Sequence, residues 1–466
     1  MTSSIQTDVA VIGAGTAGLT AFSELRRQGL RAVLIDHGPL GTTCARLGCM
    51  PSKAVLHAGQ QWHTWRAIAG DDTKQQPSLT PIDLWRQARA TRDLLADNTA
   101  KRTRSFAGEQ LIMGRARFTG PNTLDVDGRT VEAGAFIVAT GSQSIVPEFL
   151  RPLSQRLLTT DTLFELDELP TSIGILGLGA VGLEMGLALS RLGVRVIAGD
   201  LQPVPANIAD PEIGARAIER FSTEMTMWLG QPMEVLPKQT GLELRSGSAS
   251  ANVELLLAAL GRRPNTDSLG LKLAGVAHNT KDQPIIDPQT LRGGSSTVFF
   301  AGDVNQLRPL MHEAVDEGVI AARAAAQLLD DRTRSLPLRR TPLAIIFSDP
   351  DIASIGQSYD SLDLERTIIS TAQGDSNGRS RVMGAEDNLL RLYVDQQDGQ
   401  LLGASLIATR GEHLAHLLAW AIQRGETVDE LLQLPYYHPS IEELLQNALK
   451  DASQQLRVRQ STPQRA

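Results

Sequence analysis

The stretch "VAVIGAGTAGLTAFSELRRQGLRAVLID", residues 9–36, has the pattern of a strand, a glycine-rich turn, a helix and a second strand. Gly13, Gly15 and Gly18 allow a tight turn and let a pyrophosphate approach the helix N-terminus, where free N–H groups favour negative charge. Asp36 ends the second strand, where a carboxylate can accept hydrogen bonds from a ribose. The stretch therefore predicts a βαβ unit that binds a dinucleotide.

The same pattern occurs again in "SIGILGLGAVGLEMGLALSRLGVRVIAGD", residues 172–200. Its glycines are Gly177, Gly179 and Gly182, and its acid is Asp200, which again lies 18 residues after the third glycine. One such motif can be a glycine-containing turn without a ligand. Two copies, each with strand, helix and acid in register, favour two bound dinucleotides.

The acid of the second unit also bears on the kind of dinucleotide. Asp200 would repel a 2′-phosphate, and no arginine or lysine follows it in "LQPVPAN", residues 201–207. The sequence therefore predicts NAD rather than NADP at this site. Asp36 gives the first site the same preference for an unphosphorylated ribose, which FAD also has.

The composition indicates a globular protein with a sizeable core. Of the 466 residues, 42% are hydrophobic and 21% are charged, and the net charge is −7. This acidic balance argues against a general affinity for nucleic acid. No run of about 18 apolar residues is present, so we expect no membrane span and a cytoplasmic protein. The length predicts two to four domains at about 100–200 residues each.

The chain has only two cysteines, Cys44 and Cys49, too few for the disulfide scaffold of a small secreted domain. In a regular α-helix, residues five apart have Cα atoms about 8.7 Å from each other, and a disulfide requires less than about 7 Å. A bridge between them therefore needs a distorted helix, which Gly48 and Pro51 favour. We expect a readily reduced, redox-active disulfide. The alternatives are two inert thiols or part of a zinc site, and the absence of CxxC and HxxxH patterns disfavours a metal site.

The chain resembles the class I pyridine nucleotide-disulfide oxidoreductases, and most closely their dihydrolipoamide dehydrogenases. The resemblance runs from end to end and is carried, in the family's order, by "GAGTAG", "CARLGCMPSK", "VATG", "GLGAVGLE", "GRRPNT", "FFAGD" and "HPSIEE". It implies an α/β fold with two Rossmann-like dinucleotide-binding domains, for FAD and NAD, and a C-terminal α+β dimerisation domain. The implied boundaries are 1–148 and 270–336 for the discontinuous FAD-binding domain, 149–269 for the NAD-binding domain and 337–466 for the C-terminal interface domain.

The resemblance also implies roles around the two thiols. Cys44 would exchange with the substrate, and Cys49 would contact the flavin as a thiolate. Lys53, paired with Glu184, would lie near the reactive edge of the isoalloxazine, where a cation stabilises the charge of reduced flavin. The alternative is that Lys53 is an ordinary surface lysine and Glu184 an ordinary helix residue.

One of the eight histidines, His438 in "YYHPSIEELLQNALKD", is the candidate acid–base residue of the thiol–disulfide exchange. Pro439 suits the first position of a helix, and Glu443 would lie one turn into that helix, where it could hold the imidazole in one tautomer. The family pattern selects Glu443 rather than Glu442. A histidine before a helix can also be a simple cap or surface residue. In the family, this histidine reaches the dithiol of the other subunit, which implies an obligate homodimer.

The remaining site residues are implied by the resemblance as cofactor contacts, and no metal site is expected. The residues implied for FAD are Gly13, Gly15, Gly18, Asp36, Thr43, Lys53, Ala116, Thr140, Gly141, Gly302 and Asp303. The residues implied for NAD are Gly177, Gly179, Gly182, Asp200 and Gly261.

The function implied is oxidation of a free or protein-bound dihydrolipoyl group by NAD+, with FAD and the Cys44–Cys49 disulfide as relay. A 2-oxo acid dehydrogenase complex is one partner that this function suggests. The alternatives are an NAD(P)H-dependent reductase of another small disulfide such as glutathione, a soluble pyridine nucleotide transhydrogenase, or a flavin-binding protein without turnover. Thr42, Arg46 and Tyr436 depart from the family pattern. These departures leave the relay intact and the physiological disulfide open.

Two local features complete the expectations. Thr80 has the character of an N-cap with Pro81 in the first turn of the helix that follows. The polar tail "SQQLRVRQSTPQRA", residues 453–466, is expected to be mobile.

Overall fold

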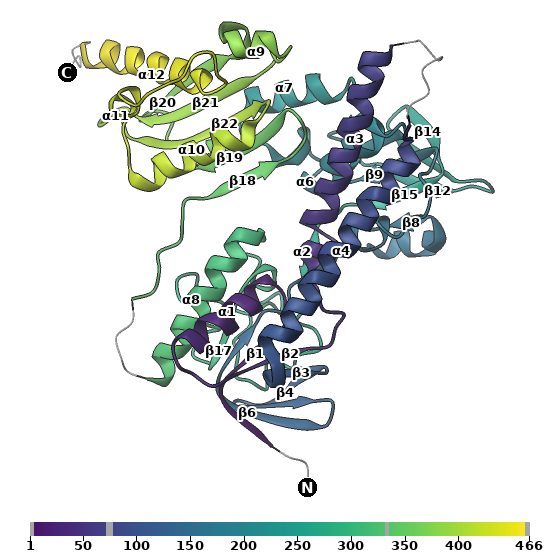
Figure 1. Cartoon of the computed structure of the whole chain (residues 1–466), viewed down its shortest axis with the longest axis vertical. Coiled ribbons are helices and arrows are strands. Elements are labelled where there is room, and N and C mark those ends of the chain that lie inside the picture. Colours follow the sequence, from purple (N-terminus) through teal and green to yellow (C-terminus); the bar gives the residue numbers. More distant parts are fainter. Residues whose placement is uncertain (1–3, 71–77, 331–334, 462–466) are drawn as a thin grey trace.

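The computed structural model describes residues 4–70, 78–330 and 335–461. It contains two sheets of mainly parallel strands covered by helices, followed by one antiparallel sheet with its own helices. In Figure 1 the first parallel sheet forms the lower part of the molecule, and the other two sheets form the upper part. The expected α/β class, with two Rossmann-like units and a C-terminal α+β domain, is confirmed.

The first sheet has the strand order β3-β2-β1-β6-β5-β4, with β17 on the free stretch of β6. Its core is the expected βαβ unit of β1 (Ile5–Ile12), α1 (Thr16–Arg27) and β2 (Ala32–Asp36). The last four residues of β1 are all buried, as in a parallel strand covered on both faces. Its other strands are β3 (Leu111–Met113), β4 (Ala116–Gly120), β5 (Thr123–Val126), β6 (Arg129–Val138) and β17 (Val298–Phe300).

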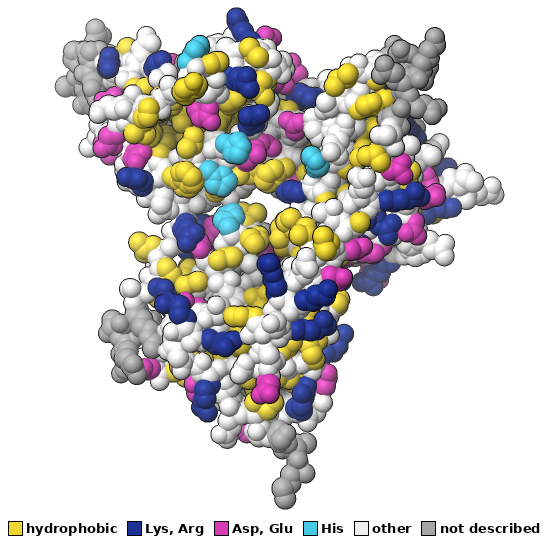
Figure 2. Space-filling view, in the orientation of Figure 1, with side chains coloured by type: hydrophobic (Ala, Val, Ile, Leu, Met, Phe, Trp, Pro, Cys, Tyr) yellow, Lys and Arg dark blue, Asp and Glu magenta, His cyan; other side chains and the backbone are white. Residues whose placement is uncertain are grey.

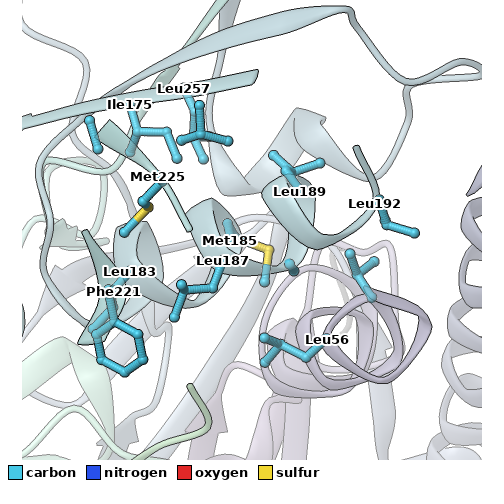
Figure 3. Packing of buried hydrophobic residues seen from close by; sticks show 14 of the residues in the cluster. Leu56, Ile175, Leu183, Met185, Leu187, Leu189, Leu192, Phe221, Met225 and Leu257 are labelled. Carbon is cyan, nitrogen blue, oxygen red and sulfur yellow. The ribbon is translucent and has the colours of Figure 1, made fainter. Parts of the chain in front are cut away.

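The second sheet is wholly parallel, in the order β11-β10-β9-β15-β8. The second βαβ unit consists of β9 (Ser172–Leu176), α6 (Ala180–Arg191) and β10 (Arg195–Asp200). Figure 3 shows Leu183 and Leu187 of α6 beside Phe221 in the apolar core of this unit. The other elements around this sheet are β8 (Leu157–Leu158), α7 (Pro211–Phe221), β11 (Thr226–Leu229), β15 (Leu255–Ala258) and the separate antiparallel strands β12 (Glu234–Pro237), β13 (Leu242–Ser246) and β14 (Ala249–Val253).

Each of the two glycine-motif helices is approached closely by another helix through a glycine. Helix α8 (Met311–Leu329) packs on α1, and a Cβ added to its Gly318 would lie 2.6 Å from the carbonyl oxygen of Ala17. Helix α3 (Cys49–Ala69) packs on α6, and a Cβ added to its Gly59 would lie 2.8 Å from the carbonyl oxygen of Ala188. The absence of a side chain at these glycines therefore sets both helix spacings.

Helices α3 and α4 (Pro81–Ala107) run side by side from the first sheet to the second (Figure 1). The expected start of α4 is confirmed. Thr80 is its N-cap, and the Thr80 hydroxyl and Asp83 carboxylate form a reciprocal capping box, with Pro81 in the first turn. Because α3 begins at Cys49 and also packs on α6, it places Cys49 between the two βαβ units.

The third sheet is antiparallel, in the order β18-β19-β22-β21-β20. It docks on the N-terminus of α7 through the buried pair of Arg391 and Asp210 (3.2 Å), and the Tyr393 hydroxyl also donates to Asp210 (2.7 Å). Arg391 pairs in addition with the exposed Glu212 (2.6 Å). Its elements are β18 (Leu343–Ile346), β19 (Asp351–Gly356), β20 (Thr367–Gln373), α9 (Gly378–Val382), β21 (Leu389–Asp395), β22 (Leu401–Ala408), α10 (Gly411–Arg424), α11 (Val428–Leu432) and α12 (Glu443–Ser461).

Short elements connect the three sheets. Strand β7 (Ser142–Ser144) pairs with β16 (Arg262–Pro264), so that the segments entering and leaving the second sheet lie side by side. The other short helices are α2 (Thr43–Arg46), α5 (Thr160–Leu163), and the 3-10 helices Gly108–Gln110, Glu148–Arg156, Pro205–Asn207, Asp303–Asn305, Tyr359–Ser361 and Gly374–Ser376. Among the described residues, no helix is long and apolar enough to cross a membrane.

Two expectations about the C-terminal region are wrong. Helix α12 begins at Glu443 instead of Pro439, because the Ser440 N–H donates to the Glu443 carboxylate (3.0 Å) in a turn that precedes the helix. The supposedly mobile tail is helical as far as Ser461. Its residue Leu456 is buried in the core of the third sheet, which explains the order. Residues 462–466 lie outside the described part of the chain.

Candidate active site

A cavity of about 1000 Å³ lies between the two βαβ units and is lined by both glycine motifs and both cysteines. It brings together thirteen of the predicted site residues: Gly15, Thr43, Cys44, Cys49, Lys53, Gly141, Gly177, Gly179, Glu184, Asp200, Gly261, Gly302 and Asp303. The predicted residues outside its lining are Gly13, Gly18, Asp36, Ala116, Thr140, Gly182, His438 and Glu443.

In each motif, the turn itself requires the first and third glycines, whereas the middle glycine has open space around it. Gly13 has a φ of +107°, and a Cβ on Gly18 would overlap the carbonyl oxygen of Gly13, so the turn itself requires both. A Cβ on Gly15 would have only one atom near it, at 3.9 Å, and Gly179 in the second motif has none within 4 Å. Since these two middle glycines line the cavity, both turns leave room for a group as large as a pyrophosphate.

The acids that follow the two motifs hold the glycine turns in place. Asp36 accepts the Ala14 N–H at 2.7 Å, and Asp200 accepts the Leu178 N–H at 2.6 Å. The other oxygen of each carboxylate accepts an N–H two residues further along the chain, at 2.6 and 2.8 Å. Each acid therefore ties the end of its strand to its glycine turn, a second role that the sequence did not indicate.

The helix is interrupted between the two cysteines, as their spacing predicts. Helix α2 ends at Arg46, and α3 begins at Cys49 after Gly48, whose φ and ψ of −119° and −114° are not helical. A Cβ on Gly48 would lie 3.4 Å from the Cα of Cys44, so glycine lets the two segments approach. Both cysteines are free thiols in the structure, and the expected redox-active disulfide stays a prediction.

The two thiols differ in acidity. The hydrogen bond between them is the main reason why the pKa of Cys49 falls to about 7 and the pKa of Cys44 rises. Burial acts to raise both values, and the charge of Lys53 acts to lower both. Cys49 is therefore the thiol that ionises near neutral pH, and Cys44 stays protonated beside it.

Lys53 forms an ion pair with Glu184, as expected. The Lys53 ammonium lies 2.9 Å from both carboxylate oxygens, and the Glu184 side chain is 7% exposed. Phe347, which the sequence did not single out, completes the group: its N–H donates to Glu184 (3.0 Å), and its ring centroid lies 4.6 Å from the ammonium. No local pattern could have revealed Phe347, because it is 163 residues from Glu184 in the sequence.

Asp303 lines the cavity at the end of the first sheet and accepts the Ser142 hydroxyl at 2.8 Å. Arg262 also lines the cavity and donates to Ser142 at its hydroxyl (2.9 Å) and carbonyl (2.7 Å). Its guanidinium lies 3.5 Å from Asp161. The motif "GRRPNT" was noted in the sequence, but the part that Arg262 plays in linking the two units was missed.

Thr140 and Ala116 are placed outside the cavity lining. The Thr140 hydroxyl donates to the Asn265 carbonyl (2.8 Å), and the Asn265 amide donates back to the Thr140 carbonyl (3.0 Å). Ala116 begins β4 and pairs with Val126. The predicted contacts of Thr140 and Ala116 with FAD therefore stay predictions.

Two departures from the family pattern lie at the ends of α2, Thr42 as its N-cap and Arg46 as its last residue. Thr42 has a φ of 55°, which β-branched residues rarely adopt, and its hydroxyl caps α2 by accepting the Ala45 N–H at 3.2 Å. Arg46 donates to the Pro39 carbonyl at 3.4 Å, and a Cβ on Gly41 would lie 3.0 Å from its Cδ. The third departure, Tyr436, donates its hydroxyl to the Leu431 carbonyl at 3.3 Å.

His438 and Glu443 form a couple away from this cavity. The imidazole Nδ1 lies 3.0 and 3.2 Å from the two carboxylate oxygens, and this hydrogen bond lowers the pKa of Glu443. The His438 side chain is 77% exposed. Figure 2 shows that the face of the molecule is hollowed between the α8 region and the α10 region, with histidine side chains around the hollow. The couple is thus assembled within one chain but meets no thiol of that chain.

Comparison with protein families gives two matches. Residues 7–318 match the model of the pyridine nucleotide-disulphide oxidoreductases, and residues 343–449 match the model of the dimerisation domain of that family.

Individual relatives cover nearly the whole chain. A dihydrolipoyl dehydrogenase from Thermus scotoductus is 28% identical over 95% of this chain and 96% of its own length. A mercuric reductase from Staphylococcus aureus is 27% identical over 91% of this chain and 78% of its own length. The solved structure of the HOCl-induced flavoprotein disulfide reductase RclA from Escherichia coli, as its Cu(II) complex, shares the fold, with a TM-score of 0.82, 22% identity and coverage of 96% and 99%.

Proposed function

Because this chain belongs to the pyridine nucleotide-disulphide oxidoreductase family, we propose that it passes electrons between NAD(H), FAD and the Cys44–Cys49 pair, with a dihydrolipoyl group as substrate. Enzymes of this family depend on FAD and bind a pyridine nucleotide, either NAD or NADP. The observation that carries the proposal is the placement of two thiols of unequal acidity on the wall of a cavity that both glycine motifs share.

The residues of the cavity suit two dinucleotides. The open turn at Gly15, with Thr43 and Asp303, would hold FAD, and the open turn at Gly179, with Asp200, would hold the nicotinamide dinucleotide. When bound, FAD supplies a group that exchanges electrons with both the nicotinamide and the dithiol. The Lys53–Glu184 pair would place a cation beside that group.

The charges in the cavity favour NAD over NADP. Among the described residues that line it, the basic ones are Lys53 and Arg262. Lys53 is paired with Glu184, and Arg262 is held by Ser142 and Asp161. Neither cation is free to bind a 2′-phosphate, and Asp200 would repel one.

The apolar part of the cavity lining favours an uncharged alkyl disulfide such as a lipoyl group. Leu47, Pro309, Leu310, Met311 and Ile345 contribute apolar surface to the cavity. A lipoyl group is a hydrocarbon chain that ends in a cyclic disulfide, so such surface suits it. Oxidised glutathione has four carboxylates, for which this lining supplies no unpaired cation among the described residues.

The exchange step needs a base, and His438 is the proposed one. As one substrate sulfur attacks Cys44 of the disulfide, His438 would take its proton, the Cys44–Cys49 bond would break and Cys49 would leave as a thiolate. The second substrate thiol would then attack the substrate sulfur bound to Cys44, release Cys44 and pass its own proton to it, while the imidazole keeps the first proton. Glu443 would hold the imidazole in the required tautomer.

The position of the His438–Glu443 couple supports a homodimer. Its imidazole is exposed and meets no thiol of its own chain, so the dithiol it serves would be in the partner subunit. The match of residues 343–449 to a dimerisation domain supports the same arrangement. A protein-bound lipoyl group would then approach from the dimer face.

The test is NAD+ reduction by dihydrolipoamide with the purified flavoprotein, with Cys49→Ser alongside. We expect turnover that the substitution abolishes, and a clear preference for NAD+ over NADP+. NADH-driven reduction of oxidised glutathione serves as the comparison reaction. Flavin that NADH reduces, without turnover of dihydrolipoamide, would refute the lipoyl assignment and leave the electron relay in place.

A further inference from the structure

The loop after β18 docks on α6 at two points. The Phe347 N–H donates to Glu184 (3.0 Å), and Arg191 donates to the Asp349 carbonyl (2.8 Å). Glu184 and Arg191 are seven residues apart, or two turns of α6. The loop therefore lies along α6, and the third sheet reaches the edge of the cavity through it.

The ring of Phe347 covers the ammonium of Lys53. The ring centroid is 4.6 Å from the nitrogen, and the Lys53 side chain is 35% exposed. A cation over an aromatic face within about 6 Å is attracted by the negative face of the ring, more strongly where water is partly excluded. The ammonium is therefore held from two sides, by the Glu184 carboxylate and by the ring.

Lys53 lies on the same side of α3 as Cys49, because residues four apart on a helix are neighbours. A cation at that position stabilises the Cys49 thiolate, and the charge of Lys53 contributes to the lowered pKa of this cysteine. An ammonium that moved away into water would be screened and would stabilise the thiolate less.

We propose that Phe347 is a positioning residue for the dithiol, whose ring holds the Lys53 ammonium beside Cys49. The charge environment of the thiols is then completed by docking of the third sheet on α6, and the two dinucleotide-binding units alone do not supply it. The inference rests on the proposed redox role of the dithiol, which it deepens.

The test uses the full chain with Cys44→Ser, so that Cys49 is its one cysteine, and measures the rate of alkylation by iodoacetamide against pH. We expect Phe347→Leu to raise the midpoint by about half a pH unit, a roughly threefold change in proton affinity. Phe347→Tyr keeps an aromatic face and should keep the parent midpoint.

A matched control is available in the same chain. The ring of Phe106 lies 5.5 Å from the Arg26 guanidinium, and it is on α4, away from the thiols. Phe106→Leu therefore removes a comparable contact, and the Cys49 midpoint should not move. Ring-fluorinated phenylalanines at 347 keep the shape of the side chain but weaken its negative face, so the midpoint should rise stepwise with the number of fluorines.

A Phe347→Leu profile that overlays the parent would overturn the proposal. So would a midpoint that rises with leucine but ignores fluorination, because the ring would then act only by its shape. Thermal unfolding of each variant shows whether the docking itself is lost. The alkylation assay needs no turnover, so a failure of dihydrolipoamide oxidation would refute the proposed substrate without deciding this inference.

Discussion

The two βαβ units share one turn geometry but differ in what their helices contact. In both, the outer glycines pack against backbone, the middle glycine is open and the acid accepts an N–H from the turn. Two residues after the third glycine, however, the first unit has Thr20 and the second has Glu184. The Thr20 hydroxyl bonds its own helix at Thr16 (2.9 Å), whereas Glu184 pairs with Lys53.

The difference teaches that the two units share the geometry of the turn, whereas the helix that follows decides which other elements each unit contacts. Helix α1 faces α8, which descends from the end of the first sheet near Asp303. Helix α6 faces α3, which begins at a cysteine, and also meets the loop of the third sheet. The second unit is therefore the one placed to influence the thiols.

The largest effects are expected at the turns, where the two units should behave alike. Gly182→Ala forces the turn apart, because its Cβ would overlap the Gly177 carbonyl. We expect kcat/KM for NADH to fall about 100-fold, the cost of roughly 1 Å of misplacement. Gly18→Ala should instead release flavin, measured by the flavin absorbance of the purified protein. Loss of flavin from Gly182→Ala and its retention in Gly18→Ala would contradict the assignment of the two turns.

Substitutions at the two close helix contacts should then affect the two units differently. Gly59→Ala and Gly318→Ala both overpack a helix pair and should each lower the free energy of unfolding by about 1–3 kcal/mol. Only Gly59→Ala displaces α3, which begins at Cys49. Only this variant should therefore change the alkylation rate of Cys49, although both variants lose stability. Denaturant unfolding measures the free energy of unfolding, and alkylation measures the reactivity of Cys49. Equal alkylation rates in the two variants would contradict the proposal that the packing of α3 on α6 affects Cys49.

The next largest effect is expected from replacing the side chain two residues after the third glycine, Glu184 in α6 and Thr20 in α1. Glu184→Gln leaves Lys53 without its carboxylate, a loss that partial exposure of the lysine reduces to about 1–2 kcal/mol. We expect a roughly tenfold slower reduction of the flavin by NADH, measured by stopped-flow absorbance. Thr20→Val is the counterpart in the first unit and should leave that rate unchanged. A slower rate in both variants would mean that the position acts through helix packing.

The smallest effect concerns pH. Cys49 has its pKa lowered to about 7 from an ordinary value of 9.0, so its thiolate is present above that pH and is lost as the pH falls through it. Lys53→Met removes a cation that favours the thiolate, and it should raise the alkylation midpoint by about one pH unit. In the reduced protein, ionisation of Cys49 adds to the free energy of unfolding as the pH rises from 7 to 9, and this gain should be smaller in Lys53→Met. An unchanged midpoint would show that Lys53 does not contribute to the acidity of Cys49.

The predictions from the sequence were most accurate for structural features that depend on residues close together in the sequence. The glycine turns, the helix break at Gly48 and the N-cap at Thr80 depend on residues a few positions apart, and the structure has all three. The Lys53–Glu184 and His438–Glu443 contacts were inferred by resemblance, and both pairs are in contact. Their roles stay predictions, because contact alone does not establish chemistry.

Two of the errors come from packing between distant segments, and the third comes from a local turn. The contact of Phe347 with Lys53 joins segments far apart in the sequence, which no periodicity records. The polar C-terminal tail was expected to be mobile, yet Gln455 donates to the Ile369 carbonyl (3.3 Å) and Leu456 is buried. The start of α12 was placed at Pro439 because the preference of proline for a first helical position was followed, and the spacing of Ser440 and Glu443, whose contact holds the turn before the helix, was overlooked.

The placement of β17 has a consequence for synthesis on the ribosome. This strand completes the first sheet by pairing Val298–Phe300 with the end of β6, at Val138. About 160 residues separate the paired segments, and at about 5–20 residues per second they take roughly 10–30 seconds to translate. During that time the nascent first unit lacks both β17 and the cover that α8 gives to α1, while the second unit has all its strands by Ala258. The unit that leaves the ribosome first would therefore finish folding second, and it would expose apolar surface to chaperones in the interval.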